Sequence, residues 1–157
     1  MDQLVNQAAK IRYMFGGQIS VPMILRSQGG TGRSAAAQHS QSLEAWVMHT
    51  PGLHLAVPAD ATDAYVLIKQ ALTLADPVVF LEHKGLYAKS FPFNPESALP
   101  WGRAKISRSG NDCSIICYSR MAQRCLDASE QLAELGVQVE VIDLRTLHPL
   151  DMETVTK

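Results

Sequence analysis

The sequence predicts an α/β fold, in which a parallel-sheet domain is followed by the start of a second α/β domain. Two observations indicate this arrangement. Short apolar runs alternate along the chain with longer amphipathic segments, the order of strand, helix and strand that builds parallel sheets. A proline-rich stretch at 91–103 interrupts this alternation without apolar periodicity, so it is expected to be a linker.

The elements before the linker begin and end at recognisable signals. Helices are expected at 4–15, 34–49 and 60–75, and strands at 21–26, 52–58 and 77–82. The first helix ends at Gly16 and Gly17, and Asp60 is the expected N-cap of the third helix. The first strand is a continuous apolar run, which is typical of a strand covered on both faces.

After the linker the alternation resumes. A strand at 113–119, a helix at 122–136 and a strand at 137–144 are expected, and a last helix begins at Asp151. The chain therefore divides into residues 1–90, the linker 91–103 and residues 104–157. It opens inside one helix and closes within another, so we expect the back part of one domain and the front part of a second.

Composition and charge exclude several classes of protein. Of the 157 residues, 46% are hydrophobic and 18% are charged, which is usual for a globular domain. A formal net charge of −1 argues against nucleic acid or a membrane surface as partner, and no apolar run approaches the roughly 20 residues of a membrane span. Cys113, Cys117 and Cys125 contain no CxxC pair, so we expect reduced thiols and no structural zinc.

The segment RSQGGTGRSAAAQHSQ, residues 26–41, places a glycine cluster between an expected strand and an expected helix. Its spacing Gly30-x-Gly32-x-x-Ala35 is close to the dinucleotide fingerprint G-x-G-x-x-G/A. However, the next strand ends in LAVP without the acid that would hold a ribose, and the chain has no P-loop sequence. A dinucleotide site and a plain turn that needs glycine for backbone room both stay open.

His39 is the second candidate in this segment, on the first turns of the expected helix. A histidine beside a flexible loop can act as acid, base or hydrogen-bond donor near neutral pH. An ordinary surface or core histidine is the alternative. Further along, Glu82, His83 and Lys84 follow the third strand and would line a channel or an interface, or form a solvated turn. Arg145 and His148 are expected at an interface or between domains, with a catalytic role as the lesser alternative.

Four stretches carry a resemblance to a known family: NQAAKIRYMFGGQISVPMILRSQGG, AAAQHSQSLEAWVMHTPGLHLAVPADATDAY, DPVVFLEHKGLY and VEVIDLRTLHPLDMETV. Together they resemble the beta subunit of the decarboxylating component of 2-oxo acid dehydrogenase complexes. That group includes the pyruvate, branched-chain 2-oxo acid and acetoin dehydrogenases, which depend on thiamine diphosphate. The resemblance implies the C-terminal part of a pyrimidine-binding thiamine domain over 1–90 and the N-terminal part of a transketolase C-terminal-like domain over 104–157.

The resemblance also implies roles for residues. His39 would be catalytic, either delivering a proton to a lipoyl sulfur or hydrogen-bonding the substrate carboxylate. The glycines of the loop would let the backbone approach a subunit boundary and would not hold a diphosphate. Main-chain oxygens that bind potassium in the family correspond here to Met23, Ala71, Leu72, Leu74 and Asp76.

The implied cofactor is thiamine diphosphate with magnesium, held together with an alpha subunit. The implied partners are the alpha subunit of an α2β2 assembly, a lipoyl acyltransferase component and a 2-oxo acid, in a bacterial cytoplasm or a mitochondrial matrix. The glutamate that activates the cofactor in this family is expected upstream of residue 1, so no cofactor-binding residue is assigned here. We therefore expect the chain alone to be inactive and marginally stable or self-associating, because its sheets would have exposed edges. Another transketolase-like thiamine enzyme and a non-catalytic interaction fragment are the alternatives.

Overall fold

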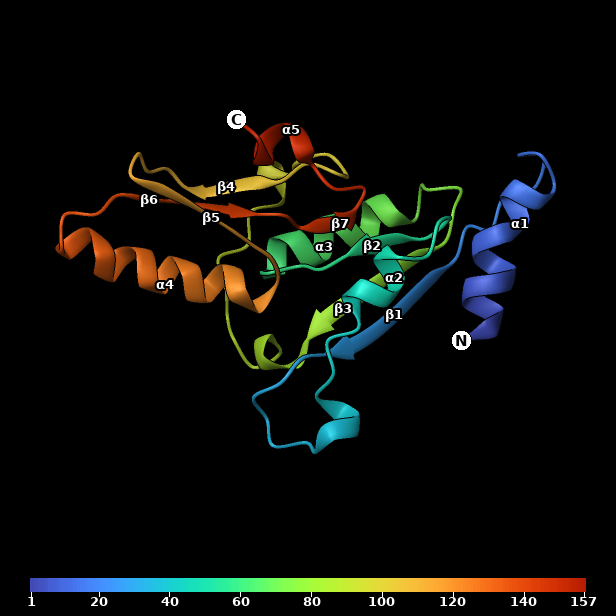
Figure 1. The fold of residues 1–157 in the computed structure, drawn as a ribbon, viewed down its shortest axis with the longest axis horizontal. Helices are drawn as coiled ribbons and strands as arrows, with labels where there is room; N and C mark the ends of the chain where they lie inside the picture. The colour runs from blue at the N-terminus through green and yellow to red at the C-terminus, as the bar shows by residue number, and fades with distance from the viewer.

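The computed structural model describes residues 1–157 and contains two β-sheets (Figure 1). The strands are β1 Ile24–Gly29, β2 His54–Ala56, β3 Val78–His83, β4 Lys105–Arg108, β5 Cys113–Cys117, β6 Val139–Asp143 and β7 Thr146–His148. The longer helices are α1 Ala9–Met14, preceded by the π-helical turn η1 Gln3–Ala8, then α2 Glu44–Met48, α3 Ala61–Ala71, α4 Arg120–Glu134 and α5 Met152–Val155. Short 3-10 turns are η2 Ala37–His39, η3 Lys84–Leu86 and η4 Pro95–Ser97. The predicted α/β fold class is confirmed.

The first sheet has the strand order β1-β3-β2-β7. Its three predicted strands pair in parallel, and the middle strand β3 buries Val78, Val79 and Phe80. On one side, Leu67 of α3 packs against Phe80 in an apolar cluster. Asp60 caps α3 as predicted, because its side chain accepts a hydrogen bond of 2.8 Å from the backbone N–H of Asp63.

Two strands, β4 and β7, were not predicted, and both pair antiparallel with their neighbours. β7 joins the first sheet beside β2, and β4 joins β6 in the second sheet, whose order is β4-β6-β5. The sheets are therefore mixed, whereas the sequence predicted parallel sheets. Three- and four-residue strands show too little periodicity to be detected locally, and their pairing is decided by distant partners.

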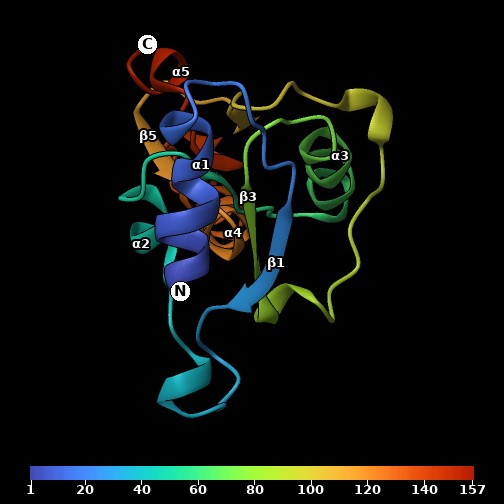
Figure 2. The ribbon, with the colours of Figure 1, turned by 90° about the vertical axis from the view of Figure 1, so that its right-hand side faces the viewer.

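The helix predicted over 34–49 is wrong in its first half. Residues 37–39 form only the single turn η2, and regular helix starts at Glu44. Ser34 and Ala36 have φ values of 52° and 60°, which a right-handed helix does not allow. His39 therefore lies in a loop, and Figure 2 shows this part of the chain extending away from the body of the molecule.

The two halves of the chain share a core and a buried ion pair. The largest apolar cluster combines Leu53 and Leu55 of the first half with Ile142 and Leu147 of the second. Arg145, which is 1% exposed, donates from Nε to Asp63 Oδ1 at 2.6 Å. The expectation that Arg145 packs between the domains is confirmed.

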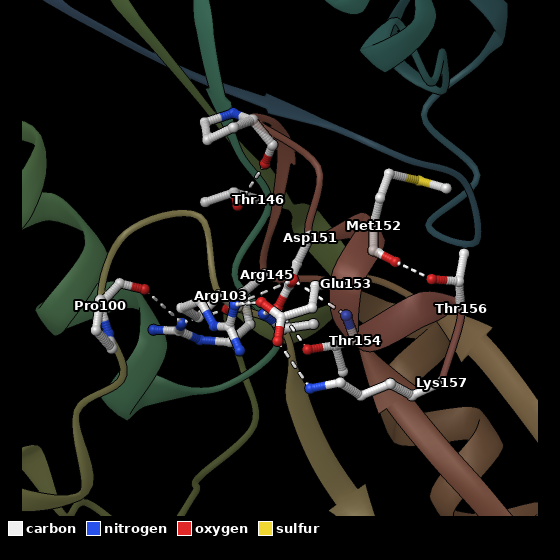
Figure 3. A network of polar contacts seen from close by, with 12 residues as sticks. Pro100, Arg103, Arg145, Thr146, Asp151, Met152, Glu153, Thr154, Thr156 and Lys157 are labelled. Carbon is white, nitrogen blue, oxygen red and sulfur yellow. Dashed lines mark hydrogen bonds and ion pairs between the residues drawn. The ribbon is translucent and has the colours of Figure 1, made fainter.

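Figure 3 shows Arg145 and Asp151 beside Pro100 and Arg103 at the end of the linker. Nη1 of Arg145 donates to the carbonyl of Arg103 at 2.8 Å. Asp151 accepts from the backbone N–H groups of Ala104, at 2.9 Å, and Thr154, at 3.2 Å. It therefore begins α5 as predicted and also holds the end of the linker.

No helix of the structure combines the length and the apolar character that crossing a membrane requires. All three cysteines are free, and only Cys117 is buried.

Candidate functional site

The candidate site lies at the carboxyl ends of β1 and β3, where parallel α/β sheets collect their ligands. Residues 30–43, which we call the projecting loop, leave the sheet here and return into α2 (Figure 1). A hydrogen bond of 2.9 Å from the N–H of Gly30 to the carbonyl of Gln41 closes the base of this loop. Most of its residues are exposed.

The glycines of the loop make room for protein side chains. A Cβ at Gly30 would lie 2.2 Å from Nε2 of His83, and one at Gly32 would lie 2.5 Å from Nη1 of Arg120. Both glycines also have positive φ, +85° and +94°. The positive φ values and the close side chains of His83 and Arg120 account for glycine at these positions without a bound phosphate.

A hydrogen bond fixes the orientation of the His83 ring, which packs against Gly30. Its Nδ1 accepts a hydrogen bond of 3.0 Å from the N–H of Gly85, so in the neutral ring the proton is on Nε2. Partial burial lowers the pKa of His83, and the positive charges of Arg120 and Lys84 lower it further. These effects favour the neutral imidazole, whose Nε2 lies against Gly30 of the loop.

Glu82 is fully engaged by its neighbours. Arg26 binds both carboxylate oxygens, with Nε and Nη2 each at 2.8 Å, and the hydroxyl of Tyr87 donates to Oε2 at 3.0 Å. The hydrogen bond to Glu82 raises the pKa of Arg26, and burial followed by the same carboxylate raises the pKa of Tyr87. Through these contacts Glu82 braces β1 against β3.

Positive side chains reach the site from both halves of the chain. Arg33 Nη1 lies 3.4 Å from the carbonyl of Lys84, and Arg120 Nη1 donates to the carbonyl of Thr31 at 3.1 Å. Arg33, Lys84 and Arg120 form no salt bridge with a carboxylate. Next to them, a cavity of about 130 Å³ lies between His83, Tyr87 and the start of α3.

His39 stands apart from this cluster. It lies in η2 of the projecting loop, is exposed, and makes no side-chain hydrogen bond. The structure thus brings His83 and Arg120 together at the loop, keeps Glu82 beside Arg26 and Tyr87, and leaves His39 open to solvent. Sequence reasoning missed Arg120. No local pattern could have identified it, because its contact with Thr31 spans 89 positions of the sequence.

The five positions assigned to potassium lie on two adjacent segments. The N–H of Val21 donates to Ala75 O, and that of Val78 donates to Met23 O, each at 2.9 Å. The carbonyls of Met23 and Ala71 each accept one backbone hydrogen bond, which leaves each a second lone pair. Asp76 Oδ1 forms an ion pair with Arg12 Nη1 at 3.5 Å, and Leu72 is 72% exposed. No group of three or more His, Cys, Asp or Glu residues with metal-binding geometry is present.

Comparison with known proteins identifies relatives along the whole chain. The transketolase pyrimidine-binding domain matches residues 1–89, and the transketolase C-terminal domain matches residues 102–157. The chain is 48% identical over 156 residues to the beta subunit of acetoin:2,6-dichlorophenolindophenol oxidoreductase from Cupriavidus necator, covering 98% of this chain and 46% of that subunit. It is 46% identical to pyruvate dehydrogenase E1 component subunit beta-2 of Oryza sativa subsp. japonica, covering 99% of this chain and 43% of that one.

A human relative and a solved structure complete this comparison. Identity to the human pyruvate dehydrogenase E1 component subunit beta is 42%, over 99% of this chain and 45% of the human one. The chain thus spans less than half the length of these curated relatives. A split gene transketolase, described as an inactive beta4 tetramer, superimposes with a TM-score of 0.75 at 22% identity, covering 99% of this chain and 50% of that chain. At that identity the likeness establishes the fold.

Proposed function

We propose that this chain, which belongs to the transketolase pyrimidine-binding domain family, forms part of the beta subunit of a 2-oxo acid dehydrogenase complex. The whole protein would take part in thiamine diphosphate-dependent oxidative decarboxylation of a 2-oxo acid, or in the matching reaction of acetoin, and in acyl transfer to a lipoyl group. Identities of 42–48% to beta subunits over nearly the whole chain support this assignment.

One structural observation carries the proposal for the site: the projecting loop leaves the carboxyl end of β1, beside that of β3, and presents His39 without a side-chain hydrogen bond. A side chain that is exposed at this edge of the sheet can meet a substrate brought by another subunit. We assign His39 as the catalytic residue of this chain. Its imidazole either donates a proton as the lipoyl ring opens or hydrogen-bonds the carboxylate of the substrate.

Thiamine diphosphate would supply the electron sink for decarboxylation. Glu82, the acid at the end of β3, is hydrogen-bonded by Arg26 and Tyr87 and is not assigned to the pyrimidine ring of the cofactor. We therefore propose that the cofactor and its magnesium are bound by other parts of the assembly, chiefly an alpha subunit in an α2β2 tetramer. A lipoyl acyltransferase component would be the further partner, in a bacterial cytoplasm or a mitochondrial matrix.

Two smaller assignments accompany this proposal. Met23, Ala71, Leu72, Leu74 and Asp76 would hold potassium through main-chain carbonyls, for which the adjacency of their two segments and the open lone pairs of Met23 and Ala71 are suitable. Residues 1–90 would act as one domain, 91–103 as the linker and 104–157 as the second domain.

A reconstitution assay tests the function. The full-length beta chain, co-expressed with an alpha subunit, is supplied with thiamine diphosphate and magnesium and assayed with an artificial electron acceptor. Turnover of pyruvate, a branched-chain 2-oxo acid or acetoin would support the proposal and name the substrate. A folded, cofactor-binding complex that turns over none of these but transfers ketol groups between sugars would contradict it.

A further inference from the structure

Arg120 crosses between the two halves of the chain at the site. It belongs to the first turn of α4, yet its guanidinium contacts Thr31, which lies 89 positions earlier in the sequence. The preceding residue, Ser119, is buried and has a φ of 53°. This sharp turn between β5 and α4 directs Arg120 back towards the first sheet.

The guanidinium occupies a gap that two glycines leave open. Added Cβ atoms would lie 2.5 Å from Nη1 at Gly32 and 3.0 Å from it at Gly85. Gly32 belongs to the projecting loop, and Gly85 belongs to η3 at the end of β3. Arg120 therefore lies between the two segments that frame the site, and a Cβ at Gly32 would displace the end of its side chain from this position.

The charge of Arg120 is directed at the backbone. It forms no salt bridge, and its hydrogen bond to Thr31 O at 3.1 Å is its one contact with an acceptor. A second link, between Arg33 and Lys84 O at 3.4 Å, fastens the same loop to η3. The remainder of the projecting loop is held mainly by its own internal hydrogen bonds.

We propose that Arg120 is a positioning residue: it clamps the projecting loop to the start of α4, beside the end of β3, so that the second half of the chain fixes where the loop presents His39. The clamp is a property of this chain's own contacts. Its consequence for activity rests on the function proposed above.

Hydrogen exchange tests the clamp in the full-length protein. Arg120→Met keeps the length of the side chain and removes its donors, so we expect exchange of the amides at 30–36 to speed up by about fivefold or more. Trypsin cleavage after Arg33 should accelerate with it, while exchange in β6 stays unchanged. Arg120→Lys should restore part of the protection, and Arg124→Ala, at an exposed position of the same helix, should change nothing.

Unchanged loop exchange in a folded Arg120→Met protein would overturn the proposal. If Arg120→Met also exposes β6, Gly32→Ala tests the same contact from the loop side, with Gly136→Ala as control. Gly136 has a φ of +84° and an open Cβ position, so both substitutions share the backbone strain and only the first displaces Arg120. Equal effects of these two substitutions on loop exchange would also overturn the clamp.

A double-mutant cycle with His39 separates positioning from a general structural role. If Arg120 acts through His39, Arg120→Met lowers kcat in the wild-type background and has little further effect in His39→Ala. Equal factors in both backgrounds would contradict positioning. If His39→Ala has no effect on activity, the proposed role of His39 fails, while the exchange data still decide the clamp.

Discussion

At the scale of single residues, charges buried between the two halves of the chain are sensitive to pH. Asp63, Asp143 and Arg145 are each at most 4% exposed. Burial raises the pKa of Asp143 to about 7, and the nearby charge of Asp63 acts in the same direction. Burial also raises the pKa of Asp63, against the opposing effect of Arg145. The guanidinium of Arg145 pairs with Asp63, whereas Asp143 accepts a hydrogen bond from the backbone N–H of Arg145.

We predict that ionisation of Asp143 weakens the fold between about pH 4 and pH 7. In the native state Asp143 keeps its proton up to about pH 7, whereas in the unfolded chain it loses the proton near its ordinary pKa of 3.8. Between these two pH values the native state therefore binds more protons than the unfolded state. The free energy of unfolding should therefore fall as pH rises through this window, by at most roughly 4 kcal/mol. The lowered pKa of His83 has the opposite effect: as the pH falls below 6.5, it decreases the free energy of unfolding.

Urea unfolding across this range checks the prediction. Asp143→Asn should flatten the profile, because the amide cannot ionise and its oxygen can still accept from the N–H of Arg145. Asp127→Asn, at an exposed position on α4, is the control. An unchanged slope in Asp143→Asn would show that another group carries the pH dependence.

Gly30 and Gly136 offer a matched pair for the packing of His83. Their φ values are +85° and +84°, but a Cβ at Gly30 meets the imidazole and one at Gly136 meets nothing within 4 Å. Gly136→Ala should cost about 1–2 kcal/mol from backbone strain alone. Gly30→Ala should cost clearly more, and adding His83→Ala should recover the difference in thermal unfolding. Equal costs would argue against the close approach of His83.

At the scale of elements, the link between α3 and the turn before β7 depends on one ion pair. Arg145→Met leaves the carboxylate of Asp63 buried without its partner, which should cost about 3–5 kcal/mol. Arg103→Met should have only a small effect, because the side chain of Arg103 is 43% exposed. Chemical denaturation compares the two variants. Partial recovery in Asp63→Asn/Arg145→Met is expected, and its absence would assign the loss to packing.

Local pattern was sufficient for some elements and not for others. The cap at Asp60, the helix α4 and the strands β1, β3 and β6 follow from apolar periodicity and capping chemistry. The alanine-rich segment at 34–37 favours helix by propensity, yet Ser34 and Ala36 take positive φ in the structure. Contacts such as Arg120 with Thr31 join residues far apart in sequence, so no single-sequence pattern could place them.

At the scale of the whole molecule, much of the surface is apolar or unpaired. Only 33 of the 157 residues are buried, and Tyr13, Leu72 and Trp46 are 85%, 72% and 62% exposed. β1 is an edge strand of the first sheet, and its middle residues are exposed. Such edges and faces favour pairing with further chain.

We therefore predict that the 157-residue chain, expressed alone, associates as its concentration rises. Sedimentation velocity at increasing concentrations should show a shift to larger species, and thermal unfolding should be broad. Adding charge to the exposed edge, as in Leu25→Lys, should reduce association. A dilute monomer with a sharp cooperative transition, unchanged at high concentration, would contradict this account.

The most direct test of the proposed function compares two acceptors in the reconstituted full-length complex. In His39→Ala, with His49→Ala as the exposed-histidine control, turnover is measured with an artificial electron acceptor and with a lipoyl-bearing acceptor. If His39 donates the proton for lipoyl opening, only the lipoyl-dependent rate should fall, by about 10²–10⁴-fold. Loss with both acceptors would assign His39 to the substrate carboxylate, and full activity with both would contradict a role for His39 in the site.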